Sequence, residues 1–148
     1  MSEQRDPEIA YWRVHTDADG VSRQNRCVMK RFALQAIQSG AAPQWQRPIA
    51  DRAAHVLFSV LPANWVGEWH ENPKPQWIIP LSGRWFVETM DGHRVEMGPG
   101  DISFGGDQRT RARDGRKGHR SGALDDAPCA LMIVQFDDEA AAGLDQDE

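Results

Sequence analysis

The chain has 148 residues, of which 40% are hydrophobic and 26% charged, and its formal net charge is −5 at pH 7. This length fits one domain with a buried core. The acidic balance argues against a nucleic-acid binder, which needs surplus basic groups, and no apolar run approaches the ~20 residues of a membrane span. The polar first residues predict no secretory signal, and Cys27 and Cys129 are too few for a disulfide framework. We therefore expect a cytoplasmic protein.

Short apolar or alternating runs predict strands along the whole chain. They lie at residues 11–15, 22–29, 55–61, 76–82, 84–90, 94–97, 102–104 and 129–136. Turns separate them, among them an Asp91-Gly92 hairpin turn and a type II turn at Pro99-Gly100. Many short strands joined by glycine and proline turns predict an all-β antiparallel sandwich or barrel.

The stretches between the strands are less regular. Residues 32–37 fit a strand or a short helix equally well, and the proline-containing stretch 39–54 predicts an ordered loop that packs on the core through Trp45. Nothing repeats and no domain boundary is visible. We therefore expect one domain at residues 9–137, a flexible tail at 1–8, and an acidic tail at 138–148 with a short helix near 139–142.

A hairpin is predicted around Ser82-Gly83. As a two-residue loop it would pair Gln76 with Thr89. Alternation then gives two largely apolar faces: one with Gln76, Ile78, Pro80, Trp85, Val87 and Thr89, the other with Trp77, Ile79, Leu81, Arg84, Phe86 and Glu88. Burying a Trp or Phe stabilises by about 1.5–3 kcal/mol. The second face therefore predicts a homodimer interface around Trp77 and Phe86, and the alternative is cover by the chain's own N-terminal segment.

A polar site is predicted beside this hairpin. His70 precedes the strand at 76–82 and Gln76 opens it, so both side chains can enter one space at the mouth of an apolar pocket. Trp69 or Trp85 could form an aromatic wall for a ring substrate, and Asn72, Gln76 and Thr89 could contact a ligand. The structural alternatives are a loop histidine, a turn residue at Asn72, a pocket-lining amide at Gln76 that bonds Thr89 or the backbone, and packing tryptophans.

These residues resemble the motifs of the cupin superfamily of small β-barrels. The first cupin motif is matched in its spacing by His70, Asn72, Gln76 and Gly83. The second is matched by Pro99-Gly100-Asp101 and by His119 within Lys117 to Arg120. The chain is most similar to small single-domain cupins of unassigned activity, over roughly residues 55–136. The resemblance implies a double-stranded β-helix, or jelly-roll barrel, with a pocket that includes His119.

The resemblance also implies one divalent metal ion, Fe, Mn, Ni or Zn, held here by His70, Gln76 and His119. This sequence departs from the family pattern, because Asn72 stands in place of a histidine and Gln76 in place of a glutamate. Neutral amide oxygens are weaker ligands for such metals, and Asn72 before Pro73 fits a turn residue. The carboxylates nearest in sequence that could complete a site are Glu68, Glu71 and Asp107.

Two functions remain open at this point. The first is an enzyme for a small molecule, in which a metal acts as a Lewis acid or activates dioxygen, or in which His70 or His119 acts as general acid–base in an isomerase, cyclase or lyase. The second is a non-catalytic barrel that binds a small ligand through Gln76 and the tryptophans. The basic stretch 109–120 is either a solvated loop or a flap whose Arg111 and Arg113 steer an anionic substrate.

Overall fold

The computed structural model describes residues 5–49 and 52–138. Every regular element in these two ranges is a strand, which confirms the all-β prediction. The strands are β1 (Ile9–Thr16), β2 (Ser22–Met29), β3 (Ala33–Gln35), β4 (Gln44–Gln46), β5 (His55–Leu61), β6 (Gln76–Ser82), β7 (Trp85–Thr89), β8 (Arg94–Met97), β9 (Ser103–Gly106), β10 (His119–Ala123) and β11 (Cys129–Gln135). The described ranges hold no helix long and apolar enough to cross a bilayer. The helix expected at 139–142 lies outside the described residues.

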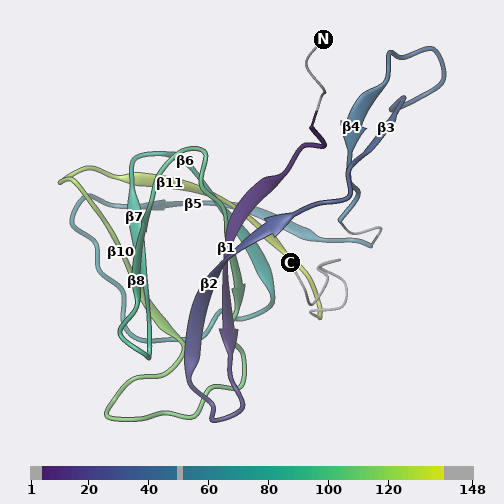
Figure 1. The fold of residues 1–148 in the computed structure, drawn as a ribbon. Helices are drawn as coiled ribbons and strands as arrows, with labels where there is room; N and C mark the ends of the chain where they lie inside the picture. The colour runs from purple at the N-terminus through teal and green to yellow at the C-terminus, as the bar shows by residue number, and fades with distance from the viewer. Residues whose placement is uncertain (1–4, 50–51, 139–148) are drawn as a thin grey trace.

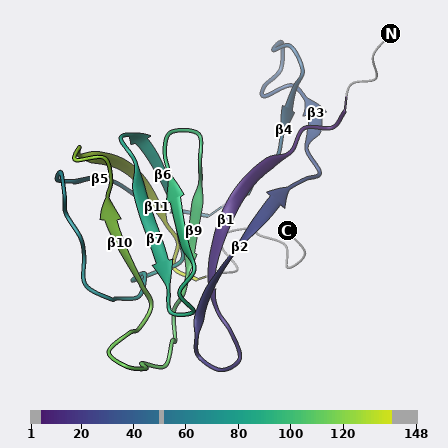
Figure 2. The ribbon, with the colours of Figure 1, turned by 60° about the vertical axis from the view of Figure 1, so that its left-hand side comes forward.

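Two sheets pack face to face (Figures 1 and 2). The larger has the order β2-β1-β9-β6-β11-β5, with β1 and β9 parallel, and the smaller has the order β10-β7-β8. Their facing sides share one apolar core, to which the larger sheet contributes Val14, Ile78 and Leu131 and the smaller contributes Trp85 and Met97. The described strand pairs do not join the two sheets into a closed barrel.

The predicted hairpin at Ser82-Gly83 is wrong. Strand β6 pairs with β9 and β11, whereas β7 pairs with β8 and β10, so the turn carries the chain from one sheet to the other. Gly83 makes this turn with a φ of 75°, and a side chain there would overlap the carbonyl of Pro128. Gln76 therefore does not pair with Thr89. Because the two strands lie in separate sheets, the second predicted face is not one continuous surface.

The two aromatic residues of the face expected at a dimer interface are covered by the chain itself, whereas Leu81 of the same face is 50% exposed. Trp77 packs edge-on against Tyr11 and Phe104, with ring centroids 5.3 and 4.9 Å away. Phe86 lies under the guanidinium of Arg94, 3.8 Å from its ring centroid. Both aromatic residues are buried. The N-terminal cover considered as the alternative is thus present for Trp77, through Tyr11 of β1.

Residues 33–35 form a strand, one of the two alternatives for residues 32–37, whereas the loop expected at 39–54 contains a second strand. Strands β3 and β4 pair with each other as a hairpin that stands away from the two sheets (Figures 1 and 2). Trp45 in β4 was expected to pack on the core, but it is 37% exposed. We call this β3–β4 hairpin the arm.

Candidate active site

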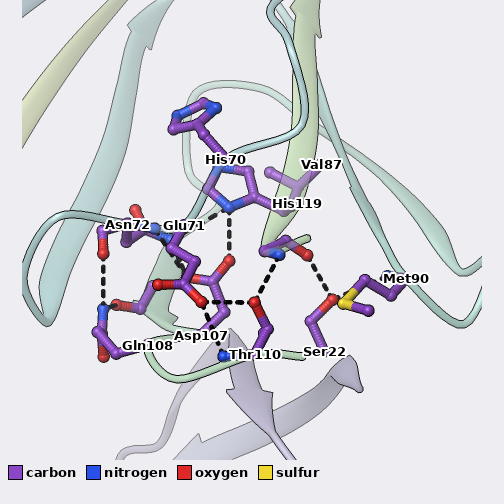
Figure 3. A network of polar contacts seen from close by, with 12 residues as sticks. Ser22, His70, Glu71, Asn72, Val87, Met90, Asp107, Gln108, Thr110 and His119 are labelled. Carbon is purple, nitrogen blue, oxygen red and sulfur yellow. Dashed lines mark hydrogen bonds and ion pairs between the residues drawn. The ribbon is translucent and has the colours of Figure 1, made fainter. Parts of the chain in front are cut away.

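Two imidazoles lie side by side where β10 begins (Figure 3). The backbones of His70 and His119 exchange two hydrogen bonds of 2.9 Å, and their ring centroids are 4.8 Å apart. Gly118, with a φ of 60°, lets the two segments approach, because a side chain there would overlap the carbonyl of His70. His119 is 4% exposed, whereas His70 lies at the surface.

A buried carboxylate holds the inner imidazole. The Nδ1 of His119 donates to Oδ2 of Asp107 at 2.7 Å, and Asp107 is fully buried. Burial raises the pKa of Asp107, but the hydrogen bond and charge of His119 and two hydrogen bonds from Asn72 outweigh it, so the pKa lies below its ordinary value. An ionised carboxylate accepts but cannot donate. Asp107 therefore fixes the proton of His119 on Nδ1 and leaves a lone pair on Nε2 whenever the ring is neutral.

The same carboxylate sets the direction of a chain of amides. Asn72 donates to Oδ1 of Asp107 from its backbone N at 3.0 Å and from Nδ2 at 2.7 Å. The freed Oδ1 of Asn72 accepts from Nε2 of Gln76 at 2.6 Å, and Oε1 of Gln76 accepts from Nε2 of Gln135 at 2.7 Å. Each amide points toward Asp107 with its NH₂ group. This network links the start of β6 and the end of β11 to Asp107 and His119.

The outer imidazole has the same tautomeric constraint. Nδ1 of His70 donates to the backbone carbonyl of Glu68 at 2.7 Å, and a carbonyl can only accept. Its Nε2 therefore carries the lone pair in the neutral form. In the described chain, neither Nε2 of His70 nor Nε2 of His119 has a hydrogen-bond partner.

The other predicted site residues, Thr89, Trp85 and Trp69, make contacts outside this hydrogen-bond network. Thr89 lies opposite His119 in the β7–β10 register, but its hydroxyl donates to Asp91 at 2.6 Å rather than to Gln76. Trp85 belongs to the apolar core, four residues along β7 from Thr89. Trp69 lies beside the guanidinium of Arg120, which extends from the face of β10 opposite to buried His119. The ring of Trp85 thus packs in the core, and that of Trp69 lies against arginine.

Two members of the network were not predicted as site residues. Asp107 was considered only as one of three carboxylates that might reach a metal, and its pairing with His119 depends on how residues 108–118 fold back. Gln135 lies directly opposite Gln76 in the β6–β11 register. Its polar side chain near the end of an apolar strand was the only signal in the sequence.

The residues present do not fit the metal set that the resemblance implies. The amide groups of Asn72 and Gln76 are engaged with each other and with Asp107 and Gln135, and Asp107 itself holds His119. Glu71 accepts two hydrogen bonds from Thr110 instead. Within residues 5–49 and 52–138, no three His, Cys, Asp or Glu side chains are grouped to hold a metal ion. Two imidazole nitrogens remain, which is fewer ligands than such metals usually take.

The basic stretch divides between two places. The backbone N of Arg111 donates to the carbonyl of Gly20 at 2.8 Å, and Nη2 of Arg113 donates to that of Asp19 at 2.9 Å. These two arginines thus fasten the loop to the β1–β2 turn. Arg116, like Arg120, lies over the ring of Trp69. The pair expected to steer an anion therefore does not flank the imidazoles.

Two clefts open elsewhere on the surface. One of about 940 Å³ has a mixed lining that includes Arg13, Lys74 and Gln108, and one of about 420 Å³ is mainly apolar and includes Trp77 and Ile79. Neither is lined by His70, His119 or Gln76. Gln108 lies between the larger cleft and the site, because it lines that cleft and its Nε2 donates to the carbonyl of Asn72 at 3.1 Å.

Comparison with known proteins gives only distant similarity. No protein-family model and no curated protein matches the chain. Among solved structures, the chain is similar to protein NMB1881 from Neisseria meningitidis, with a TM-score of 0.41, 16% identity, and 62% and 84% of the two chains covered. It is also similar to a Salmonella typhimurium protein assigned as ethanolamine utilization protein Q, with a TM-score of 0.37, 12% identity, and 88% and 98% covered. Similarity at this level defines neither a family nor an activity.

Proposed function

We propose that this chain is a cupin-type jelly-roll protein that acts on a small molecule by metal-independent general acid–base catalysis. His119 is the catalytic base, and Asp107 is the residue that positions it. The observation that carries the proposal is the 2.7 Å bond between fully buried Asp107 and Nδ1 of His119, beside a second imidazole. The cupin assignment is supported by the motif spacing and by two facing antiparallel-rich sheets that share one core.

The chemistry follows from the tautomer. Nε2 of His119 takes a proton from an acidic C–H or O–H of the substrate, and the imidazolium that forms is stabilised by the ionised carboxylate of Asp107. His70 is exposed and its ring lies next to that of His119, so its protonated form can return a proton to the product. Such a transfer is complete in itself as an isomerisation, cyclisation or elimination, and it needs no redox partner.

The first test measures the tautomers directly. Long-range proton–nitrogen correlation spectra of imidazole-labelled protein should show His119 with its proton on Nδ1 and a bare Nε2. The Asp107→Asn variant should move the proton to Nε2, because the new amide NH₂ would donate to Nδ1. Glu71→Gln is the matched control, since Glu71 contacts Thr110, and it should leave His119 unchanged. A wild-type His119 protonated on Nε2 would leave the non-catalytic ligand-binding barrel as the better proposal.

The second test looks for proton abstraction without knowing the substrate. A panel of small carbonyl compounds, including ketones, 2-oxo acids and lactones, is incubated with the protein in D₂O and followed by proton NMR. Deuterium exchange catalysed by the wild type should disappear in His119→Gln and persist in His15→Gln, whose histidine lies on β1. Exchange that survives in His119→Gln would contradict the assignment of the base.

Elemental analysis separates this proposal from metal catalysis. Protein purified without a histidine tag should contain no stoichiometric Fe, Mn, Ni or Zn. A stoichiometric metal that is lost in His70→Ala would favour the metal-dependent alternative, in which His70 and His119 are ligands.

A further inference from the structure

One face of the larger sheet is an uncovered apolar surface. On the side of β5, β11 and β6 that faces away from the shared core, Phe58 lies opposite Met132, and Met132 lies opposite Ile79. Phe58 is 68% exposed. Its neighbours on this side that are half or more exposed are Val56, Val60 and Leu81. None of these positions carries a charge, and a continuous apolar patch of this kind usually marks an interaction site. We call it the β5 face.

The edge of this sheet is also open. Among the described strands, β5 pairs only with β11, so its second edge has backbone groups with no strand partner. His55 is the only titratable residue in β5. An edge strand without charges lacks the usual protection against pairing with another chain.

The arm is a second uncovered apolar surface. Its strands pair only with each other, and a two-stranded hairpin alone is marginally stable in water. Ile37 at its tip is 68% exposed, and Leu34 and Trp45 are exposed as well. Figures 1 and 2 show the arm standing away from both sheets of its own chain. Something other than this chain's own core must cover these side chains if the hairpin is to be stable.

We propose that the arm of one copy packs on the β5 face of a second copy, and that the reciprocal contact closes a two-fold homodimer. A two-fold axis makes the two contacts identical, so both uncovered surfaces of both copies are covered at once. Large apolar side chains at about half exposure present on the order of 100 Å² each, so the seven exposed residues of arm and face offer roughly 700 Å² per copy. The dimer would bury about 1,400 Å², within the range of about 1,200–2,000 Å² for stable interfaces. This interface shares Ile79 and Leu81 with the face predicted from the sequence, but it excludes the buried Trp77 and Phe86 and adds the arm.

Light scattering on a size-exclusion column and sedimentation equilibrium of the full chain test the proposal. The wild type should be a dimer. Phe58→Asp in the β5 face, and separately the double change Leu34→Asp with Ile37→Asp in the arm, should each weaken dimerisation by about 30-fold or more. Val66→Asp is the matched control, because Val66 is also about half exposed but bridges to Gly122 beside the smaller sheet. Circular dichroism confirms that each variant is folded.

Mixing the two defective variants distinguishes an arm-to-face contact from a face-to-face one. The arm of the Phe58→Asp chain and the β5 face of the arm variant are both intact, so the mixture should form a heterodimer through one of the two contacts. A monomeric wild type would overturn the proposal. A dimer that the arm variant does not weaken, or a mixture with no heterodimer, would overturn the reciprocal arm contact.

Discussion

Replacement of Asp107 by asparagine is the sharpest single test of the site. The carboxylate accepts three hydrogen bonds, two from Asn72 and one from His119, and water does not reach it. In Asp107→Asn, the amide oxygen can still accept the two bonds from Asn72. The NH₂ group then faces Nδ1 of His119, which must give up its proton to accept. The variant keeps the shape of the network, but the buried group loses its negative charge and the proton of His119 moves from Nδ1 to Nε2.

The expected loss of stability follows from these contacts. A hydrogen bond to a charged group contributes about 1.5–3 kcal/mol, and the neutral replacement keeps part of it, so we expect Asp107→Asn to lower the free energy of unfolding by about 1.5–3 kcal/mol at pH 7. Asp107→Ala leaves three buried donors without an acceptor and should cost about 3–5 kcal/mol.

The difference in unfolding free energy between wild type and Asp107→Asn should decrease at low pH. Because the pKa of Asp107 is lowered in the folded state, its contribution is complete above the unfolded-state pKa of about 3.9 and is lost as the pH falls through the lower folded-state pKa. The gap in unfolding free energy between wild type and Asp107→Asn should therefore still be present at pH 5 and shrink below pH 4. Asp17, whose pKa is lowered to about 2 mainly by the hydrogen bond from Arg23, contributes equally to both proteins and cancels.

Urea unfolding followed by tryptophan fluorescence at pH 7, 5, 3.5 and 3, at one fixed protein concentration, measures this gap. Equal unfolding midpoints of wild type and Asp107→Asn at pH 7 would refute the reasoning. So would a gap of the same size at every pH, since it would mean that the ionised carboxylate is not the stabilising group.

Two further changes test the network and the turn beside it. Gln76→Glu places a carboxylate against Oδ1 of Asn72, so two acceptors would meet at a distance of 2.6 Å; we expect a loss of about 1–3 kcal/mol at pH 7 that diminishes as the pH falls and the new glutamate is protonated, and an unchanged urea midpoint would contradict the assigned amide directions. Gly118→Ala would bring a methyl group onto the carbonyl of His70, whereas at Gly115, with a φ of 78°, a methyl group meets nothing within 4 Å. Thermal unfolding should show a loss of about 1 kcal/mol for Gly115→Ala and a clearly larger one for Gly118→Ala, and equal losses would mean that the two segments do not approach as described.

The sequence predicted which side chains point into the core better than it predicted which strands pair. Alternation assigned Ile78, Trp85 and Val87 to one side, and all three lie in the shared core. The assumption that Ser82-Gly83 closes a hairpin was wrong. A period of two residues specifies the face of each side chain, but it contains no information on which strand lies next to it.

The arm shows the same limit for a larger segment. Proline and glycine in residues 39–54 indicated an irregular stretch, and Trp45 was expected to pack on the core. Apolar character predicts that a side chain is covered but does not say by what. In this chain the core is filled by other residues, and Trp45 remains exposed on the arm.

By itself, the sequence determined the all-β class and brought attention to His70, Asn72, Gln76 and His119, because turn residues, alternation and motif spacing are local properties. Only the tertiary structure decided that Asp107 holds His119 and that Gln135 ends the amide chain. Those contacts join residues 12 and 59 positions apart in sequence. The physical reason is that hydrogen-bond direction inside a protein is set by whichever charged group folding brings into the network, and here that group is one buried carboxylate.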